Sequence, residues 1–367
     1  MSQTEDLVRY NHEYERRLKA CFVGAGGHAF RNVYPAFRYA PVELLAVCDL
    51  DEGRARDYAR QFGAGRAYSD VAAMLEAERP EAVFIVTSYE PDGAIQSTPI
   101  ALQALAAGAH VWMEKPSAAS VAEVRRLMAA SEKAGKAVMT GLKKIFFPAV
   151  AKVKAIISDT AAFGRPSSIY VRYPQAIPRF ANRGNPLKML GLLDHIYHPA
   201  AILQHLMGPI ERMTYEWEPA CGASVASLRF VSGAVGSLHL AAGASGSSPL
   251  ERLEVVGEGA NVVLDNGVNL TYYRRAPRPD YGRAASFLVD DAVAPLTWAP
   301  EFSLGQLYNS NLFTLGYAQE VRHFCEAVLA GRAPDRGTLA EVLEIMTLFE
   351  AYQTADAGRT VVLQRAG

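Results

Sequence analysis

The chain has 367 residues, half of them apolar, and a formal net charge of −1. This length exceeds the size at which one hydrophobic core stops growing, so we expect two domains. Neither sign of charge forms a long run, which disfavours nucleic acid and anionic membranes as partners and favours a small molecule. The polar residues 1–17, expected to form an N-terminal arm, lack the apolar centre of a signal peptide, and no long apolar span follows. We therefore expect no membrane span and a cytoplasmic location.

The apolar run that begins at Leu18 predicts a buried strand that stops at glycines and turns directly into an amphipathic helix. The pattern is Gly24-x-Gly26-x-x-Ala29. Gly24 allows the tight turn, Gly26 lets phosphates approach the backbone, and the helix N-terminus attracts a pyrophosphate. The sequence therefore predicts a dinucleotide site at this turn, which Gly27 and His28 share; a glycine turn without a ligand is the alternative.

A second strand, residues 42–49, ends in Asp49. An acid at this distance, about 20 residues on, accepts hydrogen bonds from the ribose hydroxyls of a dinucleotide. A carboxylate also repels a 2′-phosphate, so Asp49 favours NAD over NADP. Arg54, in the following helix, keeps NADP open as an alternative.

Strands and helices then alternate, as in a doubly wound parallel sheet, and we assign residues 18–145 to a Rossmann dinucleotide-binding domain. Thr87, Glu114 and Lys115 fall at the carboxyl ends of strands, the edge where such sheets bind ligands, and all three are expected cofactor contacts. The expected elements are helices 51–62, 99–107 and 121–134, a shorter helix from about 69, and strands 82–87, 110–113 and 137–140.

Residues 146–367 predict a second, α+β domain that binds substrate and mediates oligomerisation. Turn dipeptides such as Ser232-Gly233 and Asn266-Gly267 separate its β-type runs, so its sheet is expected to be mainly antiparallel. We expect helices to cover one face and a partner subunit to bury the other, giving a homodimer or homotetramer. The expected strands are 168–173, 210–218, 224–231, 234–241, 253–256, 262–264 and 269–273, the helices are 148–158, 317–329 and 339–354, and 274–302 is a long loop.

Lys115 stands between Glu114 and Pro116. A lysine near a cofactor can hold or relay the proton of a substrate hydroxyl. The alternative is an ordinary surface lysine in a loop. Pro116 restricts Lys115 to an extended conformation and also admits a cis peptide bond.

Asp194 and His198 are four residues apart, which on a helix places both on one face, where a carboxylate can orient an imidazole. A helix that starts near Asp194 would put Pro199 in its first turn, where proline costs little. The alternatives are that Asp194 caps a helix and that His198 is a core residue. The intervening His195 points to another side, so we expect no metal site.

Together these residues resemble the Gfo/Idh/MocA oxidoreductases, the glucose-fructose oxidoreductase and inositol dehydrogenase family. The resemblance spans about Lys19 to Leu363, and its carriers are the glycine turn, Asp49, the block Ala101–Pro116 that ends in Glu-Lys-Pro, and the Asp194/His198 pair. It implies NAD as cofactor and a catalytic group formed by Lys115, Asp194 and His198.

The chain departs from this family at two places. Thr87-Ser-Tyr-Glu90 replaces a common Thr-Pro-Asn, an insertion runs through Gln96, and Ser97 stands where the family has a histidine. Ile145-Phe146 replaces an Arg-Phe pair, so sugar contacts at that edge are not transferred.

We therefore expect hydride transfer between C4 of a nicotinamide and a carbinol or ketone carbon of a sugar, sugar derivative or cyclitol. His198 would act as general base, Asp194 would orient it, and Lys115 would hydrogen-bond the same oxygen, although the sequence leaves open whether Lys115 or His198 takes the proton. An NAD-dependent glycosidase and a non-catalytic dinucleotide-binding regulator are the alternatives. Besides Lys115, Asp194 and His198, the expected substrate contacts are Arg172 and Lys188, with Tyr173, Arg179 and Asn182 as further candidates.

Overall fold

The computed structural model describes residues 8–276, 290–300, 307 and 310–363. The chain divides into two compact units: Met1–Lys143 with Gly316–Met346, and Lys144–Leu315 with Thr347–Gly367. The sequence-based boundary, after residue 145, assigned Gly316–Met346 to the second domain instead. This segment joins the first unit because α9 (Tyr317–Leu329) packs on the first sheet, where the Phe324 ring lies 5.5 Å from that of Phe84.

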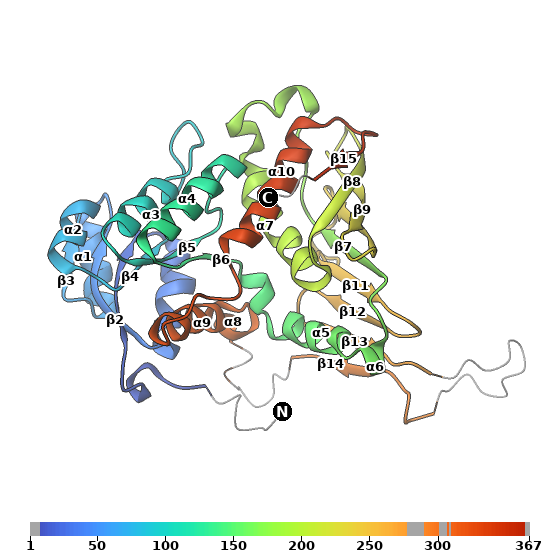
Figure 1. The fold of residues 1–367 in the computed structure, drawn as a ribbon, viewed down its shortest axis with the longest axis horizontal. Helices are drawn as coiled ribbons and strands as arrows, with labels where there is room; N and C mark the ends of the chain where they lie inside the picture. Colours follow the sequence, from blue (N-terminus) through green and yellow to red (C-terminus); the bar gives the residue numbers. More distant parts are fainter. Residues whose placement is uncertain (1–7, 277–289, 301–306, 308–309, 364–367) are drawn as a thin grey trace, which may run out of the picture. The chain divides into compact units, whose positions relative to one another are not determined.

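The first unit contains a parallel sheet of six strands in the order β3-β2-β1-β4-β5-β6 (Figure 1). Strand order reverses between β1 and β4, the position where doubly wound sheets bind dinucleotides. The strands are β1 Leu18–Val23, β2 Val42–Cys48, β3 Arg66–Tyr68, β4 Ala82–Ile85, β5 His110–Glu114 and β6 Val138–Gly141. The helices are α1 Glu52–Phe62, α2 Val71–Glu78, α3 Ser97–Ala106, α4 Val121–Ala134, α9, and the 3₁₀ helices η1 Asn11–Glu13 and η4 Lys143–Phe146, of which η4 crosses the boundary between the units.

The helix after the glycine turn is less regular than the sequence predicted. It consists of a π-helix, η2 (Ala29–Val33), followed by a 3₁₀ helix, η3 (Tyr34–Tyr39). Pro35 explains the change, because it has no N–H and its ring clashes with the carbonyl of the residue four positions earlier. The turn therefore leads into two short helical segments of different type and not into a regular α-helix.

The N-terminal arm is tied to the first unit from residue 8 onward. The side-chain amide of Asn11 donates hydrogen bonds of 2.7 Å to the backbone carbonyls of both Ala40 and Val42. These bonds fix the arm beside the start of β2.

The second unit contains a sheet of nine strands in the order β14-β13-β12-β11-β7-β10-β9-β8-β15. Only β7 and β10 pair in parallel, and all other neighbours are antiparallel, as predicted. The strands are β7 Ser168–Tyr173, β8 Ile210–Trp217, β9 Ser224–Phe230, β10 Val235–Leu240, β11 Arg252–Val256, β12 Asn261–Asp265, β13 Asn269–Tyr273, β14 Leu296–Trp298 and β15 Val361–Val362. The helices are α5 Pro148–Ser158, α6 Thr160–Phe163, η5 Phe180–Asn182, α7 Pro186–Met207 and α8 Asn311–Thr314, while α10 Leu339–Thr354 crosses the boundary between the units.

One face of the second sheet is covered by α5 and α7, which pack against β12 and β7 (Figure 1). Along β7 the side chains at 169, 171 and 173 are buried and those at 168, 170 and 172 are partly exposed. The outer face carries exposed Val225 and Val235 among polar residues. Part of the loop expected at 274–302 lies outside the described residues, and its described part includes β14.

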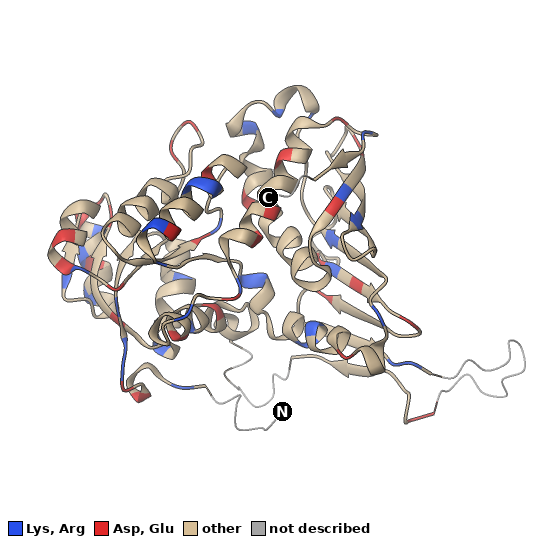
Figure 2. Cartoon of the chain, viewed as in Figure 1, with Lys and Arg blue, Asp and Glu red and all other residues tan. Residues whose placement is uncertain are grey.

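Charged residues of both signs are interspersed along both units (Figure 2). Across the described ranges, none of the helices has the length and apolar character that a bilayer crossing requires.

Candidate dinucleotide and acid–base site

The glycine turn is fixed by its backbone. Gly24 has φ +113°, a conformation that L side chains rarely adopt, and a Cβ at this position would overlap the carbonyl of Val86. Its N–H donates to the carbonyl of Cys48 at 2.8 Å, which joins the turn to the end of β2. Gly24 is therefore required by the fold, as the sequence predicted.

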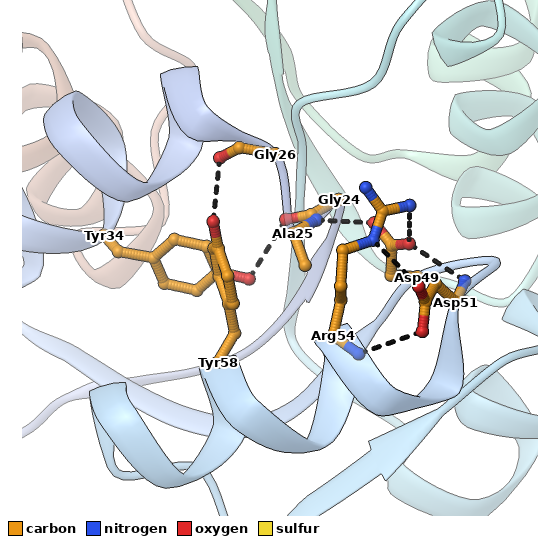
Figure 3. A network of polar contacts seen from close by, with 8 residues as sticks. All are labelled: Gly24, Ala25, Gly26, Tyr34, Asp49, Asp51, Arg54 and Tyr58. Atoms are coloured by element: carbon orange, nitrogen blue, oxygen red, sulfur yellow. Dashed lines mark hydrogen bonds and ion pairs between the residues drawn. The ribbon is translucent and has the colours of Figure 1, made fainter.

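The next two glycines face open space. A Cβ built on Gly26 or Gly27 meets no heavy atom within 4 Å. Two tyrosine hydroxyls stabilise the turn through hydrogen bonds. Tyr34 donates to the carbonyl of Gly24 at 3.2 Å, and Tyr58 donates to the carbonyl of Gly26 at 3.3 Å (Figure 3). The turn thus fits a pyrophosphate, which needs free approach to the backbone at the start of a helix.

Asp49 braces this turn. Its Oδ2 accepts a 2.7 Å hydrogen bond from the N–H of Ala25, and its Oδ1 accepts one of 3.0 Å from the N–H of Asp51 (Figure 3). Each carboxylate oxygen has about two acceptor sites, so Oδ2 can still accept a ribose hydroxyl. The bracing contact went unpredicted, because the sequence does not show which way the carboxylate turns.

Arg54 lies against this carboxylate. Its Nη2 is 2.9 Å from Oδ1 of Asp49 and its Nε is 3.4 Å from Oδ2 of Asp51. The guanidinium remains 55% exposed. Arg54 is therefore held at the edge where Asp49 is expected to meet the ribose.

The insertion after β4 forms a small closed loop. Tyr89 and Ile95 form an antiparallel bridge, and the N–H of Glu90 donates to the carbonyl of Ala94 at 2.8 Å. At its base, the buried hydroxyl of Thr87 has no hydrogen-bond partner among the described residues. A buried hydroxyl in this position suits a ligand contact.

Ser97, which stands where the family has a histidine, and its neighbour Thr98 have a structural role that sequence reasoning missed. The hydroxyl of Ser97 donates to the carbonyl of Pro116 at 3.5 Å, and that of Thr98 donates to the carbonyl of Ser117 at 3.0 Å. The start of α3 is thereby fastened to the segment that follows β5.

Lys115 directly follows β5, is partly buried, and precedes Pro116 across a cis peptide bond. Glu114 is 8% exposed. Its Oε1 lies 3.2 Å from Nε2 of His28, so the glycine turn and the end of β5 meet at this contact. Both residues belong to the first unit.

Asp194 and His198 belong to the second unit, on α7. This helix begins at Pro186, so the arrangement in which a start near Asp194 would put Pro199 in the first turn does not occur. Asn185 caps the helix by accepting from the N–H groups of Leu187 and Lys188. Asp194 is therefore not a helix cap. Pro199 lies inside α7, and a helix of 22 residues tolerates the single hydrogen bond that this proline removes.

His198 is 8% exposed, and its ring centroid lies 5.9 Å from that of Tyr173. His195 lies between two polar partners, because its Nδ1 is 3.2 Å from the Tyr173 hydroxyl and its Nε2 is 3.6 Å from Oδ2 of Asp194. Burial, with the negative charges of Glu251 and Asp194, raises the pKa of Tyr173, so the phenol keeps its proton beside His195. The structure thus adds Tyr173 and His195 to the expected group.

A partly buried ion pair borders this group. The ammonium of Lys144 contacts both carboxylate oxygens of Glu251 and lies 5.8 Å from the centroid of the Tyr173 ring. The pair was not predicted, because its members are 107 residues apart.

The remaining expected contacts are less well supported. Arg172 lies on the outer face of β7, opposite Tyr173, and its Nη1 donates to the carbonyl of Pro249 at 3.2 Å. This geometry does not support a substrate contact by Arg172. The alternation of apolar residues along β7 already indicated that Arg172 lies on the outer face of the sheet. Lys188 is exposed in the first turn of α7, and Arg179 and Asn182 are exposed before it. Within the described residues, no group of three or more His, Cys, Asp or Glu side chains is arranged to hold a metal ion.

Residues 18–142 match the model of an oxidoreductase family with an NAD-binding Rossmann fold, Gfo/Idh/MocA. The chain is 30% identical over 174 residues to D-apiose dehydrogenase of Paraburkholderia graminis, covering 46% of this chain and 43% of the relative. It is 30% identical over 164 residues to inositol 2-dehydrogenase of Salmonella paratyphi B, covering 43% of this chain and 46% of the relative. The matched part therefore spans less than half of either relative.

Among solved structures, an Agrobacterium radiobacter oxidoreductase in complex with NAD⁺, L-tartaric acid and magnesium has a TM-score of 0.75 at 18% identity. The likeness covers 95% of this chain and 98% of that one, so both units share its fold. The family match agrees with NAD as the expected cofactor. It also agrees with the resemblance on which the sequence analysis rested: residues 18–142 are similar to the NAD-binding Rossmann part of the Gfo/Idh/MocA oxidoreductases.

Proposed function

We propose that the protein transfers hydride between the nicotinamide of NAD and a carbinol or ketone carbon of a sugar, sugar derivative or cyclitol. The observation that carries this proposal is the coexistence of two features. One is the open, Asp49-braced glycine turn, and the other is the titratable group of Asp194, His195, His198 and Tyr173 on the second unit. A binding regulator needs the first feature and has no use for the second.

His198 is the general base in the proposed oxidation. It removes the proton of the reacting hydroxyl while NAD, when bound, accepts the hydride from the same carbon. Asp194 stabilises the charge that the imidazole gains. Lys115 donates a hydrogen bond to the same oxygen as it becomes a carbonyl oxygen. In the reverse direction the same groups return the proton to the ketone oxygen.

The polyol substrate class is supported by the chemistry of the second unit. Tyr173 and His195 offer polar atoms beside His198, and the Lys144–Glu251 pair supplies charge close to Tyr173. Alternating donors and acceptors of this kind suit a ligand with several hydroxyl groups. The curated relatives act on D-apiose and inositol, as their names state.

A panel of aldoses, ketoses and cyclitols, incubated with the protein and NAD, tests the proposal through absorbance of the reduced nicotinamide. We expect net reduction with at least one polyol, and its loss in Lys115→Met and His198→Gln. Glycoside cleavage without net reduction would identify an NAD-dependent glycosidase instead. Binding of NAD without turnover of any substrate would identify a regulator.

We further propose that the outer face of the second sheet pairs with a second copy of the chain, as a homodimer or homotetramer. Support comes from exposed Val225, Val235 and Tyr273 on a face that none of the described helices covers. Sedimentation of the wild type beside Val225→Glu tests this: a shift of the variant toward monomer supports the pairing, and an unchanged mass contradicts it.

A further inference from the structure

Two buried carboxyl groups of the first unit lie close enough for their charges to interact, and the proposed acid–base chemistry uses neither of them. Glu320, on α9, is 0% exposed, and Glu114, at the end of β5, is 8% exposed. None of the four carboxyl oxygens makes a hydrogen bond to any described residue. Buried polar groups are nearly always paired, so a pair of this kind calls for an explanation.

The groups around the pair come from four elements. His28 of the glycine turn approaches Glu114, and its ring lies 5.9 Å from that of Tyr317 on α9. Lys143, at the start of η4, donates to the Tyr317 hydroxyl at 2.7 Å and lies 4.7 Å from that ring's centroid. Arg31 of η2 also acts on Tyr317 through its charge.

These surroundings favour the protonated form of Glu320, because its pKa is raised. Two carboxylates in one buried site cannot both ionise readily, because each disfavours the charge of the other. Burial, then the charge of Glu114, raises the pKa of Glu320 well above its usual range, and Lys143 opposes this only in part. Gly141 leaves the space that the Glu114 carboxylate occupies, since a Cβ there would overlap Oε2.

The pair also lies on the nicotinamide side of the sheet. Asp49, which is expected to meet the adenosine ribose, ends β2 on one side of β1. Glu114 ends β5 on the other side of β1, beyond β4. A dinucleotide whose pyrophosphate lies over the glycine turn therefore extends its nicotinamide half toward Glu114. The oxidised ring carries one positive charge and the reduced ring carries none.

We propose that Glu114 and Glu320 hold one shared proton, which leaves when the oxidised cofactor binds, so that the pair discriminates NAD⁺ from NADH. The O–H bond of the protonated carboxyl breaks, and the proton passes through Glu114 to His28, whose side chain is 39% exposed, and from there to water. Glu320 acts through Glu114 and is a positioning residue, not a catalytic one. This inference requires NAD binding and does not depend on the sugar substrate.

The expected pH dependence has a definite sign. The positive ring and the proton compete for the same negative charge, so NAD⁺ binds more tightly as the pH rises and the pair loses its proton. NADH binding does not change with the state of the pair. We expect the ratio of the dissociation constants of NAD⁺ and NADH to fall by about tenfold between about pH 6 and 9.

Calorimetric titration of the wild-type full chain in buffers of different ionisation enthalpy measures the proton directly. We expect NAD⁺ binding to release a fraction of one proton near neutral pH and NADH binding to release none. An infrared band of a protonated carboxyl group should be present in the free protein and should weaken when NAD⁺ is added. Equal proton exchange for both forms, or an unchanged band, would overturn the inference.

The variant Glu320→Gln keeps the shape of the side chain and removes its ionisable carboxyl proton. We expect it to abolish both the differential proton release and the pH dependence of the affinity ratio. Glu326→Gln, an exposed carboxyl on the same helix, should retain both. If Glu320→Gln does not fold, the wild-type measurements decide.

A histidine can also change charge in this pH range. Proton release that survives Glu320→Gln and disappears in His28→Gln would assign the proton to His28 and overturn the inference. Net NAD reduction without differential proton release would overturn it and leave the proposed reaction intact. A chain that binds neither form of the cofactor would overturn both.

Discussion

The glycine turn and helix α7 position their functional groups by different means. The turn depends on backbone geometry: Gly24 admits no Cβ, and Asp49 holds the backbone N–H groups of Ala25 and Asp51. On α7, Asp194 and His198 are side chains of a regular helix, and the helix would also form with many other residues at these two positions. Cofactor binding is thus built into the fold, whereas the proposed proton transfer depends on replaceable side chains.

The largest effect is expected for Gly24→Ala. The positive φ and the overlap with the Val86 carbonyl should lower the free energy of unfolding by about 4 kcal/mol. Gly26→Ala is the matched control, since its Cβ meets open space, and its stability should stay within about 0.5 kcal/mol of the wild type. Its NAD affinity should nevertheless fall about tenfold or more, because the methyl group lies where the phosphates approach. Urea unfolding and NAD titration measure both; equal stability of the two variants would contradict this account of the turn.

His198→Gln should show the opposite pattern. We expect kcat for the preferred polyol to fall by about a thousandfold through loss of the general base, with NAD affinity and the urea midpoint close to the wild type. His205→Gln, two turns further along α7, is the control and should retain activity. Loss of activity in both variants, or in neither, would remove the distinction between His198 and the rest of the helix.

The first unit is also expected to lose stability in acid through His323 on α9. Burial, and then the charge of Arg336, lowers the pKa of His323 from 6.5 to about 4. The folded state therefore disfavours the proton, so the contribution of His323 is complete above about pH 6.5 and is lost as the pH falls toward 4. The difference in unfolding free energy between the wild type and His323→Gln should change by about 3 kcal/mol over this range. A difference that does not vary with pH would refute the buried neutral histidine.

The smallest effect concerns the choice of cofactor. Asp49→Ser should raise the affinity for NADP relative to NAD by about tenfold, because the repulsion of a 2′-phosphate is lost and Arg54 is released from its ion pair. Adding Arg54→Ala should reverse that gain. Dissociation constants for the two cofactors measure it, and a wild type that prefers NADP would contradict the role given to Asp49.

Local patterns made much of the first unit predictable. Continuous apolar runs predicted β1, β4 and β5, a glycine marked the end of β1, and the Glu-Lys-Pro segment placed Lys115 at a strand end. The irregular helix after the turn depends on Pro35, which the expected amphipathic helix did not take into account. The start of α7 at Pro186 was not identified, although the spacing of Asp194 and His198 suggested a helix there.

Contacts between distant residues were not predictable. The Lys144–Glu251 pair and the hydrogen bond between Tyr173 and His195 depend on which strands and helices pack together, and local spacing does not carry that information. The Glu114–Glu320 pair is similar, since it requires α9 to join the first unit. The position of Arg172 was predictable, in contrast, because the alternation of apolar and polar residues along β7 places it on the outer face of the sheet.

Transfer of deuterium tests the central claim most directly. The preferred polyol, deuterated at the reacting carbon, is incubated with the protein and NAD, and the reduced cofactor is analysed by mass spectrometry. The account predicts that the reduced nicotinamide carries the substrate's deuterium and that its formation slows by about a thousandfold in His198→Gln. A reduced cofactor without deuterium, or deuterium returned to a cleaved sugar with no net reduction, would contradict it.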